Sequence, residues 1–135
     1  MYDEDGFIKV ACATPKVKVA DPVYNAEEII KIIQETGANG ASLLVFSELT
    51  ISGYTCGDLF LQKPLLDECK NQLLKIADAT KGSNMVVVVG CPLVVKHKLY
   101  NCAVVLCDGK ILGTVPKTHL PNYSEFYELR HFASG

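Results

Sequence analysis

Apolar residues along this chain of 135 residues follow two different spacings. Short, nearly continuous apolar runs at 7–13, 42–46 and 85–89 are typical of buried strands. Between these runs, apolar residues recur every three or four positions, which predicts amphipathic helices at 25–36 and 64–82. A strand–helix–strand–helix–strand order needs crossover connections, so these elements predict a parallel sheet portion.

The start of the first predicted helix is marked by Asn25, with Glu28 three residues later as in a capping box. Gly37 is expected to end this helix, and Asp21-Pro22 to belong to the connection before it. Glu27 and Lys31, four residues apart, are expected to pair on its outer side. Its apolar stripe consists of Ala26, Ile29, Ile30 and Ile33.

The last third of the pattern predicts antiparallel strands. Pro64 suits the first position of the second helix. After the third strand, strands are expected at 99–107 and 110–115, and Asp108-Gly109 between them is a strong hairpin signal. Because the strands are almost continuously apolar, the sequence predicts a mixed sheet that is buried on both faces.

Composition narrows the class of protein. With 49% apolar residues, 21% charged residues and a net charge of −2, the chain is typical of a globular protein. Nucleic-acid and membrane-surface binding need basic patches, so neither partner is expected. The apolar runs are too short to cross a bilayer, and the acidic start at 1–5 does not resemble a signal peptide. The sequence therefore predicts a cytoplasmic protein.

The chain contains six cysteines, which lack the spacing of a metal site. None of them form a C-x-x-C pair, and none is followed by histidine at zinc-finger spacing. Free cysteine behaves as a small apolar residue. The six are therefore expected to be mostly reduced core residues: Cys12, Cys56, Cys69, Cys91, Cys102 and Cys107.

Two charged residues follow apolar strands and are candidates for acid–base chemistry. Glu48 follows the apolar run 43–46 and is expected at the carboxyl edge of a sheet, where α/β proteins place ligand sites. A desolvated glutamate there would take up a proton more readily, although it could instead cap backbone amides. Lys117 lies between Pro116 and Pro121 in a stiff loop. It could stabilise an oxyanion, or it could be an ordinary surface lysine.

Three further residues accompany this pair. Glu125, eight residues after Lys117, could hold the lysine or orient a substrate, or it could be a simple loop carboxylate. Tyr54 and Tyr123 lie in the loops that carry the candidate pair, where they could wall a pocket or pack the loops down. The three histidines are scattered, and no phosphate-binding loop motif is present.

Three segments carry a resemblance to a known family: 47–60, 100–110 and 117–130. They resemble the nitrilase, or carbon–nitrogen hydrolase, superfamily, and within it the amino-terminal glutaminase domains of glutamine-dependent NAD synthetases. The resemblance implies a four-layer αββα sandwich and a Glu-Lys-Cys triad. By position, Glu48 would be the general base and Lys117 the oxyanion stabiliser. Glu125 would be the accessory glutamate, and the two tyrosines would contact glutamine.

The same resemblance implies partners and cofactors outside these residues. Ammonia released from glutamine would pass to a synthetase domain, which uses ATP and magnesium to amidate nicotinic acid adenine dinucleotide. No cofactor is implied for the glutaminase domain itself, and a homo-oligomer is expected. Other amidases or carbamoylases of the superfamily form the alternative enzyme class.

The chain departs from the family pattern at two places. Ser47 stands where the family usually has proline before the glutamate, and no cysteine follows Cys107. The chain therefore resembles the first half of a glutaminase domain and is expected to be inactive alone. The last residues, 130–135, carry no pattern of a closing strand or helix, so the domain is expected to continue beyond them. A non-catalytic interaction protein that kept this half of the fold is the other alternative.

Overall fold

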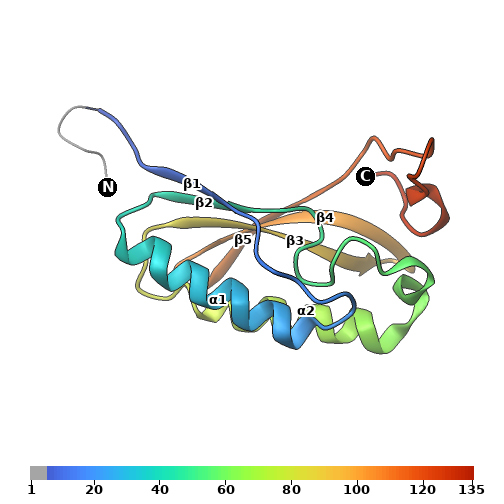
Figure 1. Cartoon of the computed structure of the whole chain (residues 1–135), viewed down its shortest axis with the longest axis horizontal. Coiled ribbons are helices and arrows are strands. Elements are labelled where there is room, and N and C mark those ends of the chain that lie inside the picture. The colour runs from blue at the N-terminus through green and yellow to red at the C-terminus, as the bar shows by residue number, and fades with distance from the viewer. Residues whose placement is uncertain (1–5) are drawn as a thin grey trace.

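The computed structural model describes residues 6–135, so the acidic stretch 1–5 lies outside the described residues. Two helices pack side by side against one face of a five-stranded sheet (Figure 1). The strands are β1 Val10–Ala13, β2 Leu43–Phe46, β3 Val86–Val95, β4 Lys98–Cys107 and β5 Lys110–Pro116. The helices are α1 Pro22–Ala38 and α2 Lys63–Asp78, and two short 3₁₀ helices are η1 Gly57–Leu61 and η2 Glu128–Arg130.

The sheet has the mixed topology that the sequence predicts. Its strands lie in the order β1-β2-β3-β4-β5. The first three run parallel, and the last three are antiparallel neighbours. Asp108 and Gly109 form the expected turn between β4 and β5, with φ angles of 46° and 75° that suit a tight hairpin. Gly109 also donates its N–H to the Thr80 hydroxyl at 2.9 Å, which attaches this hairpin to the end of α2.

β3 is twice as long as predicted, because it continues past Val89 to Val95. Gly90 and Pro92 are residues that ordinarily interrupt a strand, and they conceal this extension in the sequence. A second hairpin turn at Lys96 and His97, with φ angles of 47° and 66°, then returns the chain into β4. The extension matters for function because it places Gly90 and Pro92 beside the residues described below.

α1 begins three residues earlier than predicted. The Asp21 carboxylate caps the helix by accepting from the Tyr24 N–H at 3.1 Å, and Pro22 occupies the first turn. Asn25 is not the cap: it is fully buried, and its side chain bonds to the backbone of Lys18 and Ile51. Proline at the first helical position explains the earlier start, since its missing N–H is not needed there.

The predicted pair on the outer side of α1 is also different. Lys31 pairs with Glu28 at 2.5 Å, not with Glu27. In α2, Pro64 is the second residue of the helix, which ends at Asp78, before the predicted limit at Gly82. The apolar stripes themselves are confirmed, because Ala26, Ile29 and Ile33 of α1 and Cys69, Leu73 and Ile76 of α2 are buried in one core.

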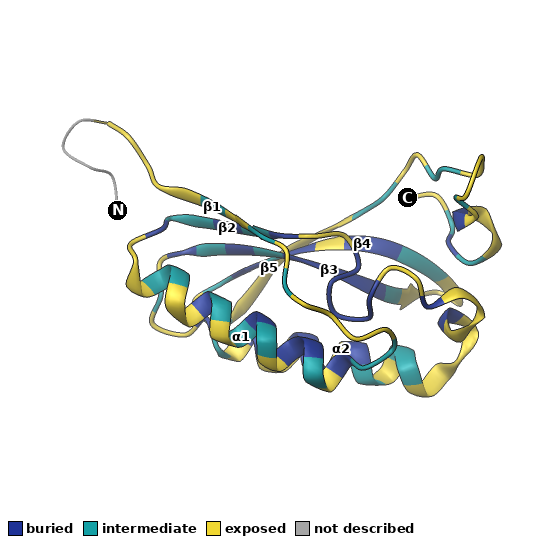
Figure 2. Cartoon of the chain, viewed as in Figure 1, coloured by how far each residue is buried: buried dark blue, intermediate teal, exposed yellow. Residues whose placement is uncertain are grey.

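Burial separates the two faces of the sheet (Figure 2). Leu44, Val87 and Val104 point toward the helices and are completely buried. On the other face the residues are apolar too, but no described element covers them, and Val115 is 62% exposed. β1 is an edge strand with half of its residues exposed, and the expectation that it is buried is wrong. The expectation of burial on both faces is not met within residues 6–135.

None of the helices in the described part of the chain is long and apolar enough to cross a membrane. The expected cytoplasmic location stays a prediction.

Candidate active site

The turn that carries Glu48 is packed directly onto the backbone of β3. Leu49 adopts a φ of 50° in the left-handed region, so the chain reverses immediately after the carboxylate. A Cβ atom added to Gly90 would lie only 2.2 Å from the Leu49 nitrogen. The Gly90 carbonyl also accepts from the Ile51 N–H at 3.2 Å. Glycine at position 90 is therefore what allows the Glu48 turn to sit at the carboxyl end of β2.

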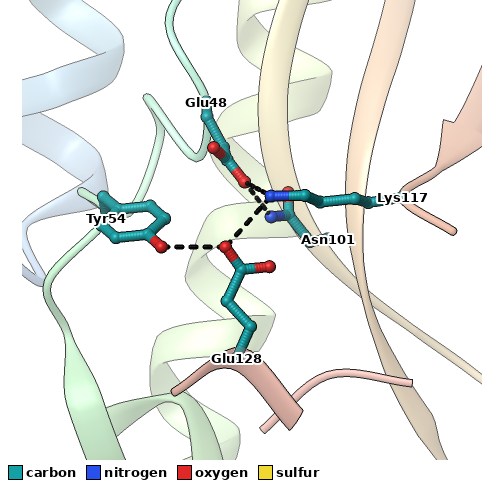
Figure 3. A network of polar contacts seen from close by, with 5 residues as sticks. All are labelled: Glu48, Tyr54, Asn101, Lys117 and Glu128. Atoms are coloured by element: carbon teal, nitrogen blue, oxygen red, sulfur yellow. Dashed lines mark hydrogen bonds and ion pairs between the residues drawn. The ribbon is translucent and has the colours of Figure 1, made fainter. Parts of the chain in front are cut away.

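Lys117 follows β5 and reaches back to the same point. Its backbone N–H donates to the Asn101 carbonyl at 2.8 Å, which continues the β4–β5 pairing by one residue. Its ammonium Nζ lies 2.7 Å from Glu48 Oε1 and 3.0 Å from Glu128 Oε1 (Figure 3). Partial burial lowers the pKa of Lys117, but the hydrogen bonds to Glu48 and Glu128 outweigh it, so the pKa is raised overall. The amine is therefore held as a cation between two carboxylates.

Glu128, in η2, is the glutamate that holds Lys117. Its side chain is only 5% exposed, and Oε1 accepts from both Lys117 Nζ and the Tyr54 hydroxyl, the latter at 2.8 Å. Its second oxygen, Oε2, is buried without a hydrogen-bond partner in the described part of the chain. The backbone N–H of Glu128 donates to the Pro121 carbonyl at 3.2 Å, which folds the loop so that this side chain turns inward.

Of the alternatives for Glu125, the structure does not bear out that this residue holds Lys117, because Glu128 does so. Glu125 is exposed, and its pKa is lowered by hydrogen bonds from its own backbone N–H and from Ser124. The sequence carries two glutamates three residues apart, and a 3₁₀ helix that begins at Glu128 selects the second one. Whether Glu125 orients a substrate stays a prediction. The sequence did not predict this 3₁₀ helix, because the residues up to and including 130–135 show no helical spacing.

Both predicted tyrosines border a cavity of about 510 Å³ beside the charged residues. Burial and the hydrogen bond to Glu128 raise the pKa of Tyr54, which keeps its hydroxyl protonated as a donor. Tyr123 is 69% exposed and packs its ring edge against Phe126, with ring centroids 5.8 Å apart. The other residues that line this cavity include Glu48, Lys117 and Glu128.

The environment of Glu48 differs from the expectation in two respects. Its side chain is 43% exposed, so the expected desolvation is not present in this structure. The alternative that it caps backbone amides is not met either, because its partners are the side chains of Lys117 and Asn101. Asn101 was missed as a site residue, although it lies in the segment 100–110 that carries the family resemblance. Its amide Nδ2 donates to Glu48 Oε1 at 2.5 Å.

A second ion-pair group ties the loop before α2 to η2. Asp58 in η1 accepts from Arg130 at 2.7 and 3.0 Å, and it lies 2.9 Å from His131 Nε2. The hydrogen bond with Arg130 has the larger effect and that with His131 the smaller, and together they hold the pKa of Asp58 well below its usual range. Beneath them Phe60 packs against Phe132, with ring centroids 5.0 Å apart. The loops that carry Tyr54 and Glu128 are therefore joined to each other.

All six cysteines are free thiols, and four of them are buried. This confirms the prediction that most are reduced core residues. Burial raises the pKa of Cys69 to about 12 and that of Cys102 to about 11, and it also raises the pKa of Cys56 and Cys91. A thiol with a raised pKa is a poor nucleophile at neutral pH. Among residues 6–135 no group of three or more histidine, cysteine or acidic side chains could hold a metal ion.

A carboxylate after β2 and an ammonium after β5 meet at one edge of the sheet, an arrangement that suits an α/β hydrolase with a Glu–Lys site. The family model for carbon-nitrogen hydrolases matches residues 9–135, so the chain belongs to the carbon-nitrogen hydrolase family. The fold is α/β and nitrilase-like, with the sheet and one layer of helices present in the described chain.

Relatives and solved structures place the chain more narrowly within the family. It is 42% identical over 132 residues to the glutamine-dependent NAD(+) synthetase of Mycobacterium tuberculosis, covering 98% of this chain and 19% of that protein. The Xylella fastidiosa glutamine-dependent NAD(+) synthetase is 40% identical over 127 residues, covering 93% of this chain and 23% of that protein. The chain thus spans about a fifth of the length of the curated relatives it matches.

The structural neighbours agree with these relatives. A glutamine-dependent NAD(+) synthetase from Cytophaga hutchinsonii superposes with a TM-score of 0.89 at 28% identity, covering 94% of this chain and 22% of that chain. The Acinetobacter baumannii enzyme, solved with adenosine diphosphate, gives a TM-score of 0.88 at 30% identity over 95% and 24% of the two chains. An amidase from Nesterenkonia sp. shares the fold at 21% identity, with a TM-score of 0.78 over 95% and 48%.

Proposed function

We propose that this chain is part of the glutaminase domain of a glutamine-dependent NAD synthetase. Its role there is to help hydrolyse glutamine to glutamate and ammonia, and the ammonia serves to amidate nicotinic acid adenine dinucleotide. The observation that carries this proposal is the 2.7 Å contact between Glu48 Oε1 and Lys117 Nζ at the strand ends. The 42% identity to a synthetase across 98% of the chain supports glutamine as the substrate.

Glu48, Lys117 and the two tyrosines then each have a task in the reaction. Glu48 accepts the proton of a cysteine thiol, and the thiolate attacks the carboxamide carbon of glutamine. Lys117 stabilises the negative charge that develops on the carbonyl oxygen. Ammonia leaves with the returned proton, and water then releases glutamate from the thioester. Tyr54 and Tyr123 wall the cavity of about 510 Å³ in which glutamine would lie.

We propose that the nucleophile comes from outside these residues. No cysteine follows Cys107 in the sequence, and the buried thiols have raised pKa values and belong to the core. The 135 residues alone are therefore proposed to release no ammonia from glutamine. ATP and magnesium are proposed to serve a separate synthetase domain, and no residue of this chain is assigned to either. A homo-oligomer is part of the same proposal.

The test uses a chimera in which this chain replaces the segment that it matches in the Mycobacterium tuberculosis synthetase. NAD synthesis is measured with glutamine and, separately, with ammonium as nitrogen donor. The parent chimera should use both donors. Glu48→Gln should abolish synthesis from glutamine, and Lys117→Ala should lower it by about 10²–10³-fold, while synthesis from ammonium survives in both. Equal loss with both nitrogen donors would show that these residues are structural and would refute the proposal.

An amidase acting on another small amide is the second candidate enzyme, supported by the shared fold of the Nesterenkonia amidase. It predicts that the chimera hydrolyses simple aliphatic amides in preference to glutamine. The two candidates are separated by measuring ammonia release from glutamine and from butyramide in the same preparation.

A further inference from the structure

Asn101 is the member of the polar network that the proposed reaction leaves without a task. It lies on β4 opposite Pro92 of β3 and is only 4% exposed. Its amide Nδ2 donates to Glu48 Oε1 at 2.5 Å, and its backbone carbonyl accepts from the Lys117 N–H at 2.8 Å. One residue therefore holds the Glu48 carboxylate through its side chain and the Lys117 backbone through its main chain (Figure 3).

These contacts distinguish the two oxygens of Glu48. Oε1 accepts from both the Lys117 ammonium and the Asn101 amide. Within the described part of the chain, no hydrogen bond reaches Oε2, and Figure 3 shows this second oxygen turned away from Lys117. An oxygen that already accepts two hydrogen bonds, one from a cation, is the weaker base of the pair. The geometry leaves Oε2 as the oxygen that can receive a proton.

The rigidity of the strands makes this arrangement specific. Asn101 lies on β4 and Lys117 directly follows the adjacent antiparallel strand β5, in which Pro116 is paired with Cys102. Their side chains can meet at a single point only because the strand register fixes both backbones. The Glu48 turn is fixed in the same way by its contact with Gly90. Lys117 alone would leave the carboxylate free to rotate around one ion pair, and the Asn101 amide supplies a second anchor.

We propose that Asn101 is a positioning residue: its amide fixes the Glu48 carboxylate so that Oε2 faces the nucleophile and accepts its proton. This inference rests on the proposed function, because it requires Glu48 to act as a base. It assigns no contact between Asn101 and glutamine. The alternative is a purely structural role, in which Asn101 only fills space between β3, β4 and the Glu48 turn.

Two substitutions in the chimera separate these roles. Asn101→Asp keeps the shape of the side chain but replaces the donating amide with a second carboxylate facing Glu48. Asn101→Ala removes both the amide and its volume. The comparison variant is Asn25→Ala, since Asn25 is also a fully buried, hydrogen-bonded asparagine but contacts none of the network. The readouts are kcat and KM for glutamine and the rate with ammonium.

For a positioning role, Asn101→Ala should lower kcat with glutamine by about 10²-fold and change KM little, because a misplaced base slows chemistry rather than binding. Asn101→Asp should lose at least as much, although it keeps the shape. Lys117 and Glu128, the charged neighbours of Glu48, are unchanged in both variants. The ammonium-dependent rate should be kept, and Asn25→Ala should not lower kcat with glutamine relative to the rate with ammonium.

The inference is overturned if Asn101→Asp is close to the parent while Asn101→Ala is impaired, because that order follows from packing alone. It is also overturned if both variants raise KM for glutamine and leave kcat unchanged. A parent chimera that uses ammonium but not glutamine would instead refute the proposed function, and the role of Asn101 would be refuted with it. The parent measurement thus separates the two failures.

Discussion

At the scale of single residues, the site depends on one ammonium shared between two carboxylates of different exposure. The Glu48 side chain is 43% exposed and is accessible to a substrate. The Glu128 side chain is 5% exposed and is enclosed by its contacts with Lys117 and Tyr54. The buried carboxylate therefore serves to hold Lys117 and Tyr54, and the exposed one is available for chemistry. Because an uncompensated buried charge is costly, Glu128 and Lys117 depend on each other.

Replacing Glu128 tests this division of tasks. Glu128→Gln keeps the shape but removes one of the two charges that raise the pKa of Lys117. Since that pKa is raised, the ion pair persists through neutral pH and is lost only as the pH rises through it. In the variant, Lys117 should lose its proton at a lower pH. The alkaline limb of the pH profile of glutamine-dependent synthesis should therefore move to lower pH. We also expect kcat to fall by about 10²-fold, because Lys117 loses its anchor.

Glu125→Gln is the matched comparison for this measurement. Glu125 is exposed and makes no contact with Lys117, so its neutralisation should leave the alkaline limb in place. An equal shift in both variants would mean that the long-range charge of the loop, and not the contact from Glu128, controls the lysine.

At the scale of elements, the site is built where one strand, β3, lies unusually close to the turn that carries Glu48. β3 continues past Gly90, and the Glu48 turn lies directly on it. The tether between Asp58 and Arg130 then holds η1 and η2 together beside that turn. The geometry of the proposed site therefore depends on the backbone of β3 as much as on the side chains that point into the site.

Gly90→Ala should disrupt both stability and activity. The added methyl group would lie 2.2 Å from the Leu49 nitrogen and 2.9 Å from the Glu48 carbonyl carbon, and both are backbone atoms that cannot rotate away. We expect a loss of about 1–3 kcal/mol in the free energy of unfolding, as for an overpacked core. We also expect a larger fractional loss with glutamine than with ammonium in the chimera. Denaturant unfolding and paired kinetics measure the two effects.

Gly113→Ala provides the control on another strand of the same sheet. Gly113 lies in β5, its φ is not in the left-handed region, and a Cβ there meets nothing within 4 Å. This variant should unfold like the parent. If the two alanine variants behaved alike, the close approach at Gly90 would not be what fixes the Glu48 turn.

At the scale of the whole molecule, the most consequential feature is the sheet face that faces away from the helices. Its residues are apolar on neighbouring strands, with Ala103 paired to Val115 and Val45 to Val88. No element among residues 6–135 covers this face, and it is continuous with a cavity of about 320 Å³ that reaches Glu48 and Lys117. Exposed apolar surface of this kind favours association.

The isolated polypeptide of 135 residues should therefore self-associate through this face. Light scattering at increasing concentration should give a rising apparent mass. Val115→Lys should reduce the association, because Val115 lies on the open face and is 62% exposed. Leu74→Lys, at a 53% exposed position of α2 on the helical layer, should not. A monodisperse monomer that unfolds cooperatively would contradict this prediction.

The sequence by itself determined the local elements and the chemistry at their ends. Period and turn signals were sufficient for the crossover helices, the Asp108-Gly109 hairpin and the mixed sheet, because these depend on neighbours within a few residues. They also placed Glu48 and Lys117 after strands, and the structure joins them at 2.7 Å. The site tyrosines likewise followed from the loops in which they lie.

Only the tertiary structure decided which polar residues meet. Glu128 replaces Glu125 beside Lys117 because a 3₁₀ helix turns the later side chain inward, and no local pattern marks so short a helix. Asn101 contacts Glu48, which lies 53 positions away in the sequence, because the register of the strands brings the two residues together. Gly90 resembles a strand end in the sequence, yet it lies within a continuous strand. These contacts join segments that are distant in sequence, so the packing of the chain, rather than its local pattern, determines them.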